Sequence, residues 1–91
     1  MSRGTRVFSG QISIVHDSVP ISLGSMACLG VTVRASLDNV DVVFVGGADL
    51  TTNNGFILKP GEGISVDIAN LNAIYLDCVH SGDTVSYIGV F

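Results

Sequence analysis

The chain has 91 residues, of which 47% are hydrophobic and 13% are charged, and its formal net charge is −4. A charged share well below the usual figure of about 25% excludes a disordered, highly charged tail, and the length fits one small domain. Its only basic residues are Arg3, Arg6, Arg34 and Lys59. These are too few for a phosphate-binding patch, so we expect no direct nucleic-acid partner.

Residues 1–6, MSRGTR, carry two arginines and no apolar side chain after Met1. This composition predicts a flexible N-terminal arm, with a single domain over residues 7–91. The first ten residues lack the apolar stretch of a secretory signal. The longest apolar runs, such as residues 42–45, are far shorter than the ~20 residues that cross a bilayer, so no membrane partner is expected.

Short runs rich in Val, Ile, Thr, Phe and Tyr recur along the rest of the chain, separated by Gly, Asn, Asp, Ser and Pro. No amphipathic helical window is present, and residues 69–72 are the one candidate for a helical turn or a strand bulge. The pattern predicts an all-β fold, a small β-sandwich or jelly-roll-like domain of seven to eight short strands. The expected strands are 7–15, 19–23, 28–35, 41–46, 56–58, 63–68, 73–79 and 84–91.

Turn residues support these boundaries. Residues 59–62, Lys-Pro-Gly-Glu, fit a type II turn, in which Gly61 takes a positive φ. Residues 37–39 fit a turn, and residues 80–83 fit a hairpin loop. Residues 48–55 form a polar loop that we interpret as a corner between strands, with side chains bonded to their own backbone and an unusual φ at Gly55.

Cys28 and Cys78 lie 50 residues apart within apolar strand-like runs. Without a secretory signal, two buried free thiols are favoured over one disulfide. Neither cysteine has a Cys or His neighbour at a metal-ligand spacing.

Catalytic signals are weak. His16 and His80 lie in turn-like stretches, no Gly-x-Ser-x-Gly motif is present, and the eight acids are scattered singly. Asp49, Thr51 and Asn53 alternate like the first ligands of a calcium loop, but residue 60 is Pro where an EF-hand needs a bidentate acid. We therefore expect no enzyme activity and no catalytic, cofactor-binding or metal-binding residues, and keep a non-standard Ca²⁺ site as an alternative.

Several segments of the chain together carry a family resemblance. The run VFVGGADLTTNNGFILKPGEG (43–63), the following ISVDIANLNAIYLD (64–77) and the terminal GDTVSYI (82–88) resemble a motif of small structural proteins of tailed bacteriophages. LGVTVRASLDN (29–39) also fits, so the resemblance covers residues 28–91. It departs at Ala48, where a polar residue is usual, and at Gly63, where Ser is common.

The resemblance implies a β-sandwich module of the virion with no active site. The first expectation is a capsid decoration (cement) protein on the outside of the shell, assembled in the bacterial cytoplasm. It would bind the major capsid (coat) protein and itself, as a trimer rather than a dimer. Alternatives are a minor tail, baseplate or head-fibre component, or a virion-surface carbohydrate-binding module. The expected interface residues are Arg3, Arg6, Asp49, Thr51, Thr52, Asn53 and Asn54.

Overall fold

The computed structural model describes residues 6–15 and 19–91, and the expected arm therefore lies outside the described residues except for Arg6. The strands are β1 (Val7–Ser13), β2 (Ile21–Ser22), β3 (Gly30–Ala35), β4 (Val43–Gly46), β5 (Phe56–Leu58), β6 (Gly63–Val66), β7 (Tyr75–Cys78) and β8 (Thr84–Val90). One turn of 3-10 helix, η1 (Leu71–Ala73), precedes β7. The eight predicted strands are confirmed, each within a few residues, as is the helical turn near residues 69–72.

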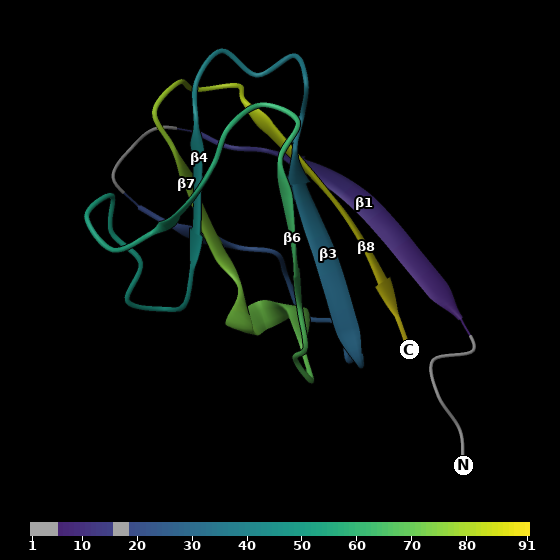
Figure 1. The fold of residues 1–91 in the computed structure, drawn as a ribbon. Coiled ribbons are helices and arrows are strands. Elements are labelled where there is room, and N and C mark those ends of the chain that lie inside the picture. The colour runs from purple at the N-terminus through teal and green to yellow at the C-terminus, as the bar shows by residue number, and fades with distance from the viewer. Residues whose placement is uncertain (1–5, 16–18) are drawn as a thin grey trace.

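The strands form two four-stranded antiparallel sheets, which Figure 1 shows as two layers. One sheet has the order β1-β8-β3-β6 and the other has the order β2-β7-β4-β5. Four of the hydrogen-bonded pairs are β1 with β8, β2 with β7, β3 with β6, and β4 with β5. The chain is thus folded like one long hairpin, whose closed end lies between β4 and β5. The all-β sandwich prediction is confirmed.

The core lies between the sheets because each strand alternates its side chains between the two faces. On β3, Val31 and Val33 are buried, whereas Arg34 is exposed, as predicted. β4 contributes three consecutive buried residues, Val43–Val45, so its outer face is covered as well. Pro20 precedes β2, which is an edge strand, in keeping with the missing N–H of proline.

Both cysteines are buried and free, as predicted. The Cys28 thiol lies 3.3 Å from the carbonyl oxygen of Ile68, and the Cys78 thiol lies 3.7 Å from that of Ile14. Each thiol therefore behaves as a small apolar side chain with a weak donor.

Of two predicted turns, one differs in the structure and the other agrees with it. The expected hairpin loop at residues 80–83 is a turn, with Asp83 N–H donating to His80 O at 3.2 Å, but it joins strands of different sheets. The prediction of a hairpin was wrong because a local turn sequence does not specify which sheet the next strand enters. The type II turn is consistent with the structure, since Gly61 has φ +89 and Glu62 N–H donates to Lys59 O at 2.9 Å.

Candidate functional site

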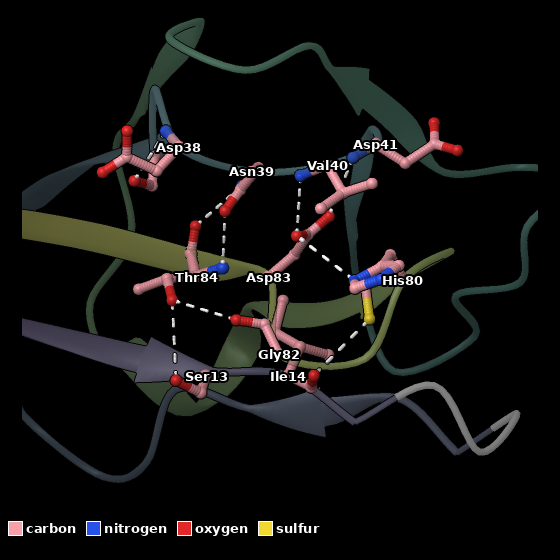
Figure 2. Close-up of polar contacts among 12 residues, drawn as sticks. Ser13, Ile14, Asp38, Asn39, Val40, Asp41, His80, Gly82, Asp83 and Thr84 are labelled. Atoms are coloured by element: carbon pink, nitrogen blue, oxygen red, sulfur yellow. Dashed lines mark hydrogen bonds and ion pairs between the residues drawn. The ribbon is translucent and has the colours of Figure 1, made fainter.

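The most connected polar cluster lies at one end of the sandwich, where two of the connections between the sheets lie next to each other. Residues 36–42 lead from β3 to β4, and residues 79–83 lead from β7 to β8. Figure 2 shows the two crossings side by side, joined by side chain to backbone hydrogen bonds. We call these residues the polar corner.

Asp83 is the centre of the polar corner. Its side chain is 3% exposed, and its two carboxylate oxygens accept hydrogen bonds from consecutive backbone N–H groups, Val40 at 2.9 Å and Asp41 at 3.0 Å. Hydrogen bonds from N–H groups to a carboxylate are stronger than neutral ones. Asp83 therefore fixes the loop before β4 to the segment before β8.

Asn39 makes a second link in the same place. Its amide N–H donates to Thr84 O at 2.9 Å, and its Oδ1 accepts from Thr84 N–H at 2.7 Å. The side chain thus pairs with Thr84 as a neighbouring strand would. Ser36 N–H also donates to Thr84 O at 3.0 Å, so both partners of the backbone of Thr84 come from this loop.

His80 is the histidine of the polar corner, and histidine is the most frequent general base in enzymes. Its side chain is 54% exposed, and Nδ1 lies 3.8 Å from Asp83 Oδ1, which is longer than a hydrogen bond. An acid that orients a catalytic histidine does so through a hydrogen bond to Nδ1, whereas both oxygens of Asp83 hold backbone groups. The arrangement serves to join the two loops. His16 and Asp17 lie outside the described residues.

The loop at 48–55 forms the corner that the sequence predicts. Thr51 Oγ1 accepts from Asn53 N–H at 3.2 Å, and Asn54 Oδ1 accepts from Thr51 N–H at 2.7 Å. Asn54 also donates to Asp49 O at 3.0 Å. The oxygens of Thr51 and Asn54 thus bond the loop's own backbone. Among the described residues, no group of three or more His, Cys, Asp or Glu side chains is placed to hold a metal ion.

The predicted special φ at Gly55 was wrong. Among the residues that the structure describes, the glycines with positive φ are Gly24, Gly61 and Gly82. Gly55 is required for space instead, because a Cβ there would lie 2.8 Å from Phe44 Cβ and 2.9 Å from Leu50 Cδ1. Close packing against another segment leaves no local mark in the sequence that distinguishes it from a turn.

Leu50 is the residue of this loop that the sequence analysis missed. It is 5% exposed, and its Cδ1 lies 2.8 Å from the position that a Cβ on Gly46 would occupy. The loop folds back so that Leu50 lies against Gly46 and Gly55, next to Phe44, which is 6% exposed. A single leucine between glycines in a polar loop was the available signal.

The expected interface residues fall into two separate places. Arg6 continues β1: it exchanges two backbone hydrogen bonds with Phe91, at 3.1 and 3.0 Å, and its Cζ lies 5.7 Å from the centre of the Phe91 ring. The loop residues Asp49, Thr51, Thr52, Asn53 and Asn54 are all exposed and follow β4 in the other sheet. Arg3 lies outside the described residues. The interface role of all these residues stays a prediction.

Comparison of the chain with protein-family models, with curated proteins and with solved structures gave no match. Within residues 6–15 and 19–91, no helix has the length and apolar character needed to cross a bilayer.

Proposed function

We propose that this chain is a non-enzymatic structural protein of a bacteriophage virion, specifically a capsid decoration (cement) protein on the outside of the shell. The phage assignment rests on the motif resemblance over residues 28–91. The physical properties of the domain support a protein that functions by being covered by other proteins.

The observation that carries this proposal is the amount of exposed apolar surface. Twelve large hydrophobic side chains among the described residues are exposed, with values from 37% for Phe91 to 71% for Leu37. They are Val7, Val15, Val19, Leu29, Leu37, Val40, Phe56, Ile57, Val79, Ile88, Val90 and Phe91. Single exposed apolar residues are ordinary, but neighbouring ones mark surfaces that bind proteins. Val7, Ile88 and Val90 lie together on β1 and β8. Phe56 and Ile57 are exposed on opposite faces of edge strand β5.

The strand pairing gives a second, weaker line of support. We infer that the long-hairpin pairing of β1 with β8, β2 with β7, β3 with β6 and β4 with β5 is a jelly roll. Jelly rolls occur in viral capsid and lectin domains, so the architecture suits a virion part. A fold by itself does not assign a function, and this argument only adds to the surface argument.

In this proposal the domain bridges neighbouring coat subunits and resists the pressure of the packaged DNA by adding buried interface area. Each contact is weak, and many copies on one shell make the attachment strong. Arg3 and Arg6 would bind acidic or carbonyl groups of the coat or of a neighbouring copy. The exposed loop around Thr52 would contribute polar contacts.

The deciding experiment is the copy number of this chain in purified virions, measured by quantitative mass spectrometry against the major coat protein. A decoration protein is expected at about one copy per coat subunit, because its attachment depends on many repeated contacts. A ratio far below this value would place the chain in the tail or baseplate. Its absence from the particle would overturn the structural role altogether.

A further inference from the structure

The outer face of the β1-β8-β3-β6 sheet has a simple layout. The register places Thr32 opposite Ile88 on one side and Ser65 on the other, so these three residues form its middle row. Gly30 and Val90 lie opposite each other at one end of the face, and Arg34 lies opposite Ser86 toward the other end. Most other side chains of this face are small hydroxyl or aliphatic groups.

Among the described residues, two charged side chains lie in the strand rows of this outer face, Arg34 on β3 and Asp67 immediately after β6. Asp38, in the loop after β3, borders a hollow next to Arg34 at the end of the face. Asp67 lies at the Gly30 end, where its Oδ1 would be 3.2 Å from a Cβ built on Gly30. Arg34 lies four positions after Gly30, which corresponds to about 13 Å along the strand. The two charges therefore sit on opposite sides of the middle row, too far apart to pair within one molecule.

Both charged groups have bonding capacity left. Arg34 donates through Nε to Gly61 O at 3.2 Å, and its other guanidinium nitrogens make no hydrogen bond to the described residues. The Asp67 carboxylate accepts no hydrogen bond from any residue that the structure describes. Each group is therefore available to a partner of opposite charge.

The face is hollowed next to Asp67. A shallow depression of about 340 Å³ lies over Gly30 and Gly89, and Val90, Ile88 and Asp67 are among the residues that border it. The depression exists because Gly30 has no side chain between Val90 and Asp67. A long side chain that enters it from above would meet apolar walls and one carboxylate, which suits an arginine.

We propose that this face binds a second copy of the same chain, with Arg34 of each molecule entering the Gly30 hollow of the other and pairing with Asp67. The two copies would be related by a twofold axis that lies parallel to the face and crosses the strands at the middle row. Rotation about this axis exchanges the two ends of the face. It places Arg34 of one copy above Gly30 of its partner and repeats the contact by symmetry. An axis parallel to the strands would keep each charge at its own end and would make no such pair.

The expected contact is small. Four strands about 4.8 Å apart and about seven residues long cover roughly 450 Å² on each copy. The total of roughly 900 Å² falls among weak, transient interfaces. Two reciprocal ion pairs add specificity and orientation rather than great strength. We therefore expect a dimer that forms at high protein concentration, or where copies are held close together.

The inference builds on the self-association that belongs to the proposed function, but it favours a dimer over the trimer expected from the resemblance. The test uses the purified full chain without any coat protein. Failure of this contact would then leave the copy-number test of the proposed function unaffected.

The experiment is sedimentation velocity of the wild-type protein between about 10 µM and 1 mM, the range in which weak complexes form. Arg34→Glu and Asp67→Arg each place two like charges at the contact, and each is expected to weaken the dimer at least about tenfold. The double variant Arg34→Glu/Asp67→Arg restores opposite charges and is expected to return the dimer. Raising the salt concentration should weaken the wild-type dimer, because the ion pairs lie at an interface open to solvent.

Asp41→Arg serves as the matched control, because it changes the net charge as Asp67→Arg does but lies at an exposed position of the loop before β4. It should leave the dimer unchanged. Circular dichroism of every variant checks that the β-fold is kept. A wild-type monomer at all concentrations, a trimer, or a dimer that tolerates both single reversals would each overturn the proposal.

Discussion

The carboxylate of Asp83 connects two loops that are distant in the sequence. It accepts N–H groups of Val40 and Asp41, which lie more than forty positions away in the chain. Asn39 and Thr84 add two hydrogen bonds beside it. These contacts connect the β3–β4 crossing to the β7–β8 crossing, and hence one sheet to the other. The polar corner is therefore a structural element, although it contains the His and Asp side chains that a search for catalysis would select.

The replacement Asp83→Asn tests this role. An amide has one acceptor oxygen, and its NH₂ group would face a backbone N–H that also donates, so one buried donor would lose its partner. We expect a loss of about 2 kcal/mol in the free energy of unfolding. Urea unfolding followed by circular dichroism gives the value. Asp38→Asn, in the same loop but exposed, is the control and should change stability by less than about 0.5 kcal/mol. Equal effects of the two replacements would contradict the role given to Asp83.

At the scale of the element, the loop between β4 and β5 has two unlike parts. Its polar residues bond one another's backbone and stay exposed, whereas Leu50 turns inward toward Gly46 and Gly55. Leu50 and Phe44 form a small apolar cluster outside the main core. The loop is thus held at its ends by the strands and in its middle by one buried leucine.

Leu50→Ala should remove this anchor. Truncating a buried leucine loses the transfer free energy of the removed atoms and leaves a cavity. We therefore expect a loss of about 2 kcal/mol in the free energy of unfolding. Hydrogen exchange of the amides at residues 51–55 should also become faster, because the loop opens without global unfolding. Leu37→Ala, at a side chain that is 71% exposed, should leave both quantities nearly unchanged. Unaltered exchange in Leu50→Ala would show that the loop is held by its polar bonds alone.

For the whole molecule, the important feature is that partners in the sheets are distant in sequence. Val7 pairs with Val90, and Ile21 pairs with Leu76. Among the strand pairs of the described residues, β4 with β5 is the one joined by a short connection. Bringing the two ends of the chain together costs conformational entropy, and this cost arises before the outer strand pairs contribute stability.

This topology predicts slow folding for such a short chain. We expect a single folding phase on the millisecond-to-second scale after dilution from urea, as in other domains dominated by non-local strand pairs. Stopped-flow fluorescence of Tyr75 and Tyr87 measures the rate. Folding in microseconds would mean that the distant pairs contribute little to the transition state.

The sequence by itself determined the all-β class, the positions of the strands, the type II turn at residues 59–62 and the two buried thiols. Each of these follows from residues close together in the chain: alternation of apolar side chains, β-branched composition and the conformational limits of Pro and Gly.

Only the tertiary structure decided which strands pair, that residues 80–83 cross between sheets, that Asp83 bonds the loop before β4, and that Gly55 is needed for space. It also placed Arg34 and Asp67 on one face, at opposite ends. These features depend on contacts between segments tens of residues apart, and local preferences are the same whether or not such contacts form. The reason is physical: burial and long-range hydrogen bonding select one arrangement among several that the local signals allow.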